Sequence, residues 1–193
     1  MSPKRKIRKS KIVYDVKAHK IAPDLAKLRS KASSAAYGPG KNGHRGEFEE
    51  KYSLQGTIAE CIAHDIYKDT DMSLAPLFDL EPVVAPDAVL GETKVDFKGR
   101  DHQEVKHYHN QKLFVNCDSH DNEKKKVDAY VFFEYDESSC DENGVCTGYK
   151  YVVPSEYFDK KNSTIHNGPF QPAYCITLSV DNVEEVDGTK KDQ

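Results

Sequence analysis

The chain contains no run of eighteen apolar residues, so no segment is long enough to cross a membrane as a helix. Its N-terminus is charged from the start and lacks the apolar stretch of a signal peptide. The five cysteines are odd in number and are scattered without a disulfide framework. These absences predict an intracellular protein of a reducing compartment, cytoplasmic and without a membrane partner.

No internal repeat divides the 193 residues, and this length suits one domain. A hydrophobic fraction of 37% beside a charged fraction of 31% allows an adequate core. We expect a basic, partly disordered arm over residues 1–20, a single domain over residues 21–180 and a flexible tail over residues 181–193.

Charge is distributed unevenly along the chain. Residues 1–50 contain 13 Lys and Arg against 5 Asp and Glu, a net charge of +8, whereas residues 51–193 contain 15 against 27, a net charge of −12. A basic arm on an acidic body suggests an anionic partner, although a solvated tail has the same composition. The stretch PKRKIRKSK, from Pro3 to Lys11, resembles a nuclear import signal, which predicts a nuclear location if the host is a eukaryote or its virus.

Hydrophobic periodicity predicts a mixed α/β fold. Leucine and isoleucine recur every four residues from Leu54 to Ile66, which indicates a long helix from about Glu47 to Lys68. A shorter basic helix is expected over residues 22–36. Strands are expected where Val, Ile, Phe and Tyr concentrate, over residues 11–17, 79–90, 92–99, 112–118, 127–135, 149–153 and 173–180. This order indicates a mixed central β-sheet flanked by helices.

Two acids and a lysine stand close together in the stretch PDAVLGETKVDFKGR. A two-residue turn at Gly91-Glu92, where glycine suits the first turn position, pairs Asp87 with Asp96 across two strands. Their Cβ atoms would then lie about 5 Å apart. Because side chains alternate along a strand, Lys98 shares the face of Asp96. Like charges directly opposite each other repel, so we expect a cation between the two carboxylates.

Carboxylate oxygens on adjacent strands suit Mg²⁺, with Mn²⁺ as an alternative. The backbone carbonyl of Phe97 offers a further, neutral ligand. Lys98 lies where it would orient an attacking water or stabilise developing negative charge. The pattern therefore predicts metal-dependent hydrolysis.

The residues Pro86-Asp87 and Asp96-Phe97-Lys98 resemble the motif of the PD-(D/E)XK nuclease superfamily, which has the restriction-endonuclease-like fold. The resemblance implies that both acids bind Mg²⁺ and that Lys98 assists catalysis. GTIAE, from Gly56 to Glu60, is similar to a Gly-x-x-x-Glu element in the preceding helix of archaeal Holliday-junction resolvases, which implies that Glu60 is a further catalytic and metal-binding residue. Residues 112–118 and 127–135 resemble the next core strands of the superfamily.

Two alternatives compete with parts of this interpretation. Glu92 and Lys94 form another acid-x-lysine element, but Glu92 would then lie in the turn and far from Asp87. On a helical wheel Glu60 lies nearly opposite the apolar stripe, so packing of the stripe on the sheet would point Asp65 inward and Glu60 to solvent.

Other residues are weaker candidates for sites. Lys41 and Arg45, in the glycine-rich loop that precedes the long helix, are candidate nucleic-acid-binding residues. Cys140 and Cys146 flank an Asn-Gly turn and could form a disulfide or a metal knuckle, but free thiols are expected in a reducing cell.

Together these features predict a metal-dependent nuclease that hydrolyses DNA phosphodiester bonds. Endonuclease action is favoured over exonuclease action, RNA is an alternative substrate, and the compact layout resembles nucleases of phages or mobile elements. Many such nucleases dimerise to cut both strands, so a homodimer is one possible state. The alternative is a non-catalytic nucleic-acid-binding or interaction protein.

Overall fold

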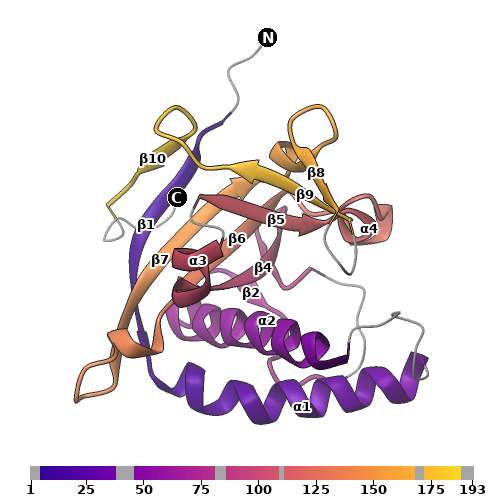
Figure 1. Ribbon diagram of the computed structural model, residues 1–193. Coiled ribbons are helices and arrows are strands. Elements are labelled where there is room, and N and C mark those ends of the chain that lie inside the picture. The colour runs from indigo at the N-terminus through magenta and orange to yellow at the C-terminus, as the bar shows by residue number, and fades with distance from the viewer. Residues whose placement is uncertain (1–4, 38–45, 81–85, 109–110, 168–171, 188–193) are drawn as a thin grey trace.

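The described part of the chain folds into two long helices, several short ones and two β-sheets, a seven-stranded mixed sheet and a three-stranded sheet (Figure 1). The computed structural model describes residues 5–37, 46–80, 86–108, 111–167 and 172–187. The helices and strands in chain order are β1 (Ile7–Asp15), α1 (Lys17–Tyr37), α2 (Gly46–Tyr67), β2 (Ser73–Leu74), β3 (Ala88–Leu90), β4 (Thr93–Asp101), α3 (His102–Tyr108), β5 (Lys112–Asn116), α4 (Cys117–His120), β6 (Ala129–Tyr135), β7 (Val145–Pro154), β8 (Thr164–Asn167), β9 (Pro172–Thr177) and β10 (Val183–Glu185).

The seven-stranded sheet has the order β10-β1-β7-β6-β4-β3-β2. Its centre is mixed, because β4 and β6 run parallel while β6 and β7 run antiparallel. The connection from β4 to β6 leaves the sheet and supplies β5, which pairs with β9 in the smaller sheet. A mixed central sheet with helices packed against it confirms the expected α/β class.

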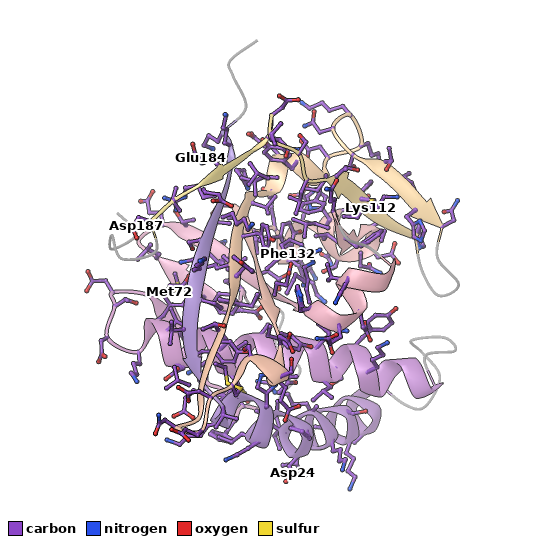
Figure 2. The ribbon with its side chains drawn as sticks, turned by 60° about the vertical axis from the view of Figure 1, so that its left-hand side comes forward. Asp24, Met72, Lys112, Phe132, Glu184 and Asp187 are labelled. Carbon is purple, nitrogen blue, oxygen red and sulfur yellow. A yellow bond between two sulfur atoms is a disulfide. The ribbon has the colours of Figure 1, made fainter. Side chains whose placement is uncertain are left out.

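The central sheet is covered on both faces. Helices α1 and α2 lie side by side beneath it in Figure 1, and β5, β9 and β8 lie on its other side. The first core lies between the helices and the sheet, where Ile58 and Ile62 of α2 meet Phe97 and Phe133. The second core lies between the two sheets and includes Phe132, which Figure 2 labels in the interior.

Strand β6 explains why both faces must be covered. Val131 and Phe133 belong to the first core, whereas Tyr130 and Phe132 belong to the second. A strand that is apolar on both faces is stable only when each face is buried, and this is how its sequence is expected to behave. The neighbouring β4 therefore runs through the middle of the molecule, with its odd-numbered side chains toward α2.

Glycine lets α2 lie unusually close to β4. A Cβ added at Gly99 would overlap with the backbone carbonyl of Gln55 in α2. The absence of a side chain at this position brings the helix backbone against the strand. The close contact lies one residue after Lys98, and it holds α2 at the level of the predicted acids.

The structure corrects three expectations about the fold. Residues 7–10 belong to β1 rather than to a disordered arm, and β10 pairs with β1 within the segment expected to be a loose tail. Residues 112–116 form a strand as expected, but this strand lies in the smaller sheet and not beside β4 in the central one.

Among the described helices, none combines the length and the apolar character that crossing a bilayer requires.

Candidate active site

The hairpin of β3 and β4 has the register expected from its turn. Leu90 pairs with Thr93, and Ala88 pairs with Val95. Gly91 has a φ of +61°, a conformation that glycine adopts without strain at the first position of a tight hairpin turn. The expected register is confirmed, and its continuation places Asp87 opposite Asp96.

The ladder ends at Asp87, whose side chain replaces a backbone partner. Oδ2 of Asp87 accepts a hydrogen bond of 2.6 Å from the backbone N–H of Phe97. The next position in the register is Pro86, which has no N–H to donate. Because the N–H and the carbonyl of one residue in an antiparallel strand face the same neighbour, the carbonyl of Phe97 points toward this open end of β3. Asp87 therefore binds the N–H of Phe97 through its side chain. Pro86, which has no N–H, cannot donate a strand-to-strand hydrogen bond to the carbonyl of Phe97.

Lys98 lies on the same face of β4 as Asp96. Its ammonium group is in direct contact with Oδ2 of Asp96, and the two side chains are 31% and 24% exposed. Nζ of Lys98 also lies 5.8 Å from the centre of the Tyr130 ring. Tyr130 is the partner of Asp96 in the parallel ladder between β4 and β6, so it forms one wall of the site.

Glu60 reaches the same region from α2. Its carboxylate pairs with Arg29 of α1 at 2.7 Å, and both side chains are about three-quarters buried. Arg29 also donates a hydrogen bond to the carbonyl of Leu77, so its position is determined on two sides. Asp65 lies elsewhere, where it accepts a hydrogen bond from the backbone N–H of Asp15. The apolar stripe of α2 packs on the sheet, yet Glu60 faces α1 and the acids rather than solvent.

Burial and repulsion from neighbouring carboxylates raise the pKa values of Asp87 and Glu60. Burial raises the pKa of Asp87 well above its ordinary value, and the negative charges of Asp96 and Glu60 raise it further. Burial also raises the pKa of Glu60, against the opposing effect of Arg29 and with a further contribution from Asp96. The three carboxylates are therefore close enough to sense one another's charge.

The surroundings of Lys98 favour its charged form, whereas those of Asp87 and Glu60 favour the neutral acid. Burial alone would lower the pKa of its ammonium group, but the surrounding carboxylates of Asp96 and Asp87 outweigh that effect and raise it. Lys98 is therefore charged in this arrangement, and it acts as a cation rather than as a proton acceptor. Three acids with Arg29 and Lys98 leave the cluster with a net charge of −1 when every group is ionised.

The donor set suits a hard divalent cation. Carboxylate oxygens of Asp87, Asp96 and Glu60, with the carbonyl of Phe97, are the oxygen ligands that Mg²⁺ prefers. The acids are spread apart in this structure. Among the described residues, the set of ligand atoms within 4.8 Å of one another is His19, Cys140 and Cys146, and the acids do not form such a set. Binding a cation would require the acid side chains to move closer together than they are in this structure.

Several residues of the site could not be found from the sequence. Arg29 lies in a helix of many basic residues and has no pattern that marks it. His120 donates to or accepts from the Tyr130 hydroxyl at 2.9 Å, and its other ring nitrogen lies 3.4 Å from Asp159. Only the contact between the His120 and Tyr130 side chains in the folded chain shows that this histidine supports the tyrosine beside Lys98.

Other sequence candidates lie apart from this cluster. Lys41 and Arg45 lie outside the described residues, so their predicted role in binding nucleic acid stays a prediction. Cys140 and Cys146 form a disulfide, so the expectation of free thiols is wrong for this pair. The hairpin between β6 and β7 brings these two cysteines together.

Comparison with family models, with curated proteins and with solved structures finds no match for this chain. The resemblance of Pro86-Asp87 and Asp96-Phe97-Lys98 to the PD-(D/E)XK motif therefore remains a prediction from the motif. The geometry of the cluster is what bears on function.

Proposed function

We propose that the chain is a metal-dependent nuclease of the PD-(D/E)XK type that hydrolyses DNA phosphodiester bonds. One observation carries the proposal. The β3–β4 hairpin places Asp87 and Asp96 beside Lys98 at the point where β3 ends, and α2 adds Glu60 to the same charged cluster. A restriction-endonuclease-like core accounts for the mixed sheet with α2 packed behind this hairpin.

The acids have one chemical role in this proposal. Asp87, Asp96, Glu60 and the carbonyl of Phe97 would hold Mg²⁺ or Mn²⁺. The cation, when bound, supplies charge stabilisation at the phosphoryl oxygens and an attacking water that loses its proton readily. Binding is favoured because a cation relieves the repulsion from Asp96 and Glu60, which adds to the effect of burial in raising the pKa of Asp87.

Lys98 supplies positive charge that does not depend on the cation. Its raised pKa keeps the ammonium protonated, so it can donate hydrogen bonds to a non-bridging oxygen of the scissile phosphate. The ring of Tyr130 lies against this ammonium and limits its directions. Lys98 therefore orients the phosphate and stabilises the charge that develops on it during attack by water.

Arg29 positions Glu60 without touching the reacting atoms. The ion pair at 2.7 Å and the hydrogen bond to Leu77 hold both side chains between α1 and α2. A fixed Glu60 reduces the entropy lost when a cation binds. Arg29 is thus a positioning residue in this proposal.

The substrate is DNA and its backbone is the recognised element. Lys20, Lys27 and Lys31 are exposed on α1, the helix that carries Arg29. Such residues neutralise phosphates without reading sequence, so affinity for DNA should fall steeply as salt concentration rises. A flat salt response would contradict this role for the basic N-terminal region.

The test is cleavage of covalently closed circular DNA. Circular, linear and single-stranded DNA and a matched RNA are each incubated with the protein and Mg²⁺, Mn²⁺ or EDTA. An endonuclease nicks or linearises the circle in the presence of metal and leaves it intact in EDTA. Activity confined to linear ends would identify an exonuclease, and activity confined to RNA would change the substrate.

Conservative variants locate the activity within the hairpin. Asp96→Asn and Lys98→Met should reduce the cleavage rate at least about a hundredfold while DNA binding persists. Glu92→Gln and Lys94→Met are matched controls on the same hairpin, since both side chains are exposed. They should cleave at the wild-type rate, and loss of activity in these controls would instead assign the site to Glu92 and Lys94.

A failure of cleavage has a definite meaning. Wild-type protein that is folded and binds DNA, yet cuts no substrate with any metal, would overturn the nuclease proposal. A non-catalytic nucleic-acid-binding protein would then be the correct description. Protein that neither binds nor cuts nucleic acid would overturn both.

A further inference from the structure

A second group of side chains that could bind a metal lies outside the acid cluster, where the start of α1 meets the β6–β7 hairpin. His19 in the first turns of α1, with Cys140 and Cys146 of the β6–β7 hairpin, places one ligand atom from each residue within 4.8 Å of the others. In this structure the two sulfurs are bonded to each other. Figure 2 draws this disulfide as a yellow bond close to α1.

The hairpin that carries the two cysteines is held in shape without the disulfide. Oδ1 of Asp141 accepts hydrogen bonds of 2.9 Å from the backbone N–H groups of Asn143 and Val145. The backbone of Val16 donates to the carbonyl of Gly144 at 2.9 Å, which ties the turn to the start of α1. These bonds do not involve sulfur, so reduction would leave Cys140 and Cys146 as neighbours.

The histidine is held by contacts of its own. Nε2 of His19 lies 3.0 Å from the Tyr14 hydroxyl, and the edge of the Tyr135 ring packs against the imidazole. His19 is buried and Cys146 is fully buried, whereas Cys140 is partly exposed. The three side chains are thus brought together by packing, and the group is partly exposed at Cys140.

We propose that His19, Cys140 and Cys146 bind Zn²⁺ once the disulfide is reduced. A dithiol reductant transfers two electrons and two protons to the disulfide, yields two thiols and becomes a disulfide itself. Zn²⁺ then binds as each thiol releases its proton to solvent. Two thiolates and one imidazole match the ligand preference of Zn²⁺, and water completes a four-coordinate site from the partly exposed side.

In the reduced protein, the bound Zn²⁺ would replace the disulfide as the crosslink. The disulfide joins two residues of the β6–β7 hairpin, whereas Zn²⁺ would also join this hairpin to α1 through His19. Ten residues further along the same helix, Arg29 holds Glu60. The proposal concerns residues outside the acid cluster, and it does not depend on nuclease activity.

The experiment measures metal binding by reduced and oxidised protein. The full chain is reduced with dithiothreitol, desalted without oxygen and titrated with Co²⁺ and then Zn²⁺. Reduced wild type should show thiolate-to-cobalt charge-transfer absorption at one equivalent, and Zn²⁺ should displace the Co²⁺. Oxidised wild type should bind at least about tenfold more weakly, because both thiolates are then absent.

Variants separate this site from the other cysteines. His19→Gln keeps a polar partner for Tyr14. His19→Gln and Cys140→Ser, each as a single variant, should remove the absorption or weaken binding at least about tenfold. Cys117→Ala is the matched control, because Cys117 lies in the second core and should leave binding unchanged. Circular dichroism of each variant shows that it is folded.

Two results would overturn the proposal. Reduced wild type that binds Co²⁺ no better than His19→Gln would show that His19 is not a ligand. Equal binding by reduced and oxidised protein would place the metal on other residues. Neither result bears on DNA cleavage, so the two proposals fail independently.

Discussion

Replacing Arg29 by methionine tests whether one ion pair fixes Glu60 in the acid cluster. Methionine keeps much of the apolar stem of arginine and removes its charge and its donors. In the variant the carboxylate of Glu60 loses a partner at 2.7 Å, and the carbonyl of Leu77 loses a hydrogen bond of the same length. Both losses are expected to lower the free energy of unfolding.

The magnitude follows from the burial of the pair. Exposed ion pairs contribute about 0.2–1 kcal/mol, whereas breaking a fully buried pair costs about 3–5 kcal/mol. Arg29 and Glu60 are 21% and 24% exposed, which places their pair between these limits, at about 2 kcal/mol. The hydrogen bond to Leu77 adds about 1 kcal/mol. A total near 3 kcal/mol corresponds to a fall in Tm of about 6–12 °C for a domain of this size.

The assay is urea unfolding of a double-mutant cycle, carried out in EDTA. The four proteins are wild type, Arg29→Met, Glu60→Gln and the double variant. The double variant should be less destabilised than the sum of the single variants, with a coupling energy of about 1–2 kcal/mol. Lys27→Met, an exposed change on the same helix, is the control and should alter stability by less than about 0.5 kcal/mol.

Additive effects would refute the reasoning. If the two single changes summed to the double change within about 0.3 kcal/mol, Arg29 and Glu60 would not be energetically coupled. Glu60 would then have no fixed position, and its place among the metal ligands would lose its support. A loss equal to that of Lys27→Met would show that the pair is effectively solvated.

Three further predictions concern the acids and the packing behind them. Asp87→Asn should stabilise the protein in EDTA. The pKa of Asp87 is raised on folding, so the folded wild type binds a proton more tightly than the unfolded chain. The wild type therefore loses stability relative to the variant as pH rises from below 3.8 through the folded-state pKa. Urea midpoints across that pH range measure this, and a constant difference would contradict it. Gly99→Ala should lower the free energy of unfolding by about 3 kcal/mol, because the added Cβ would overlap with Gln55. Gly56→Ala, with open space around it, should raise the free energy of unfolding by about 0.5–1 kcal/mol. Equal effects of the two variants would refute the close contact. Mg²⁺ at a hundred times its Kd should stabilise the wild type by about 2.7 kcal/mol, read as a rise in Tm, and the rise should be absent from Asp96→Asn.

The hairpin could be predicted because its geometry is local. A two-residue turn at Gly91-Glu92 determines the register of the strands on either side. This register pairs Ala88 with Val95, so the next pair along the hairpin is Asp87 with Asp96. Alternation along one strand then places Lys98 beside Asp96. No distant part of the chain enters this reasoning, and the structure confirms it.

The position of Glu60 could not be decided in this way. The apolar stripe of α2 shows that one face of the helix is buried, but not which surface each flanking face meets. The sequence left two orientations open for Glu60, the predicted one toward the acids and an alternative toward solvent if the stripe packs on the sheet. The second helix, α1, covers that side and supplies Arg29, so Glu60 is paired and largely buried. The partner lies 31 positions away in the sequence, beyond the reach of periodicity.

The same limit applies to the strand over residues 112–116 and to the cysteines. An apolar strand has one pattern whether it joins the central sheet or covers it, so the smaller sheet was not visible in the sequence. His19 and the cysteines of the β6–β7 hairpin are more than a hundred positions apart. Only the docking of that hairpin on the start of α1 brings them within 4.8 Å.

The sequence by itself determined the α/β class, the long helix α2 and the hairpin with its two acids and lysine. These depend on turn chemistry and side-chain periodicity, which act over a few residues. Only the tertiary structure decided that Arg29 holds Glu60, that a second sheet covers the first and that His19 meets a cysteine pair. Contacts between distant segments depend on how buried surfaces fit, and no local pattern encodes that fit.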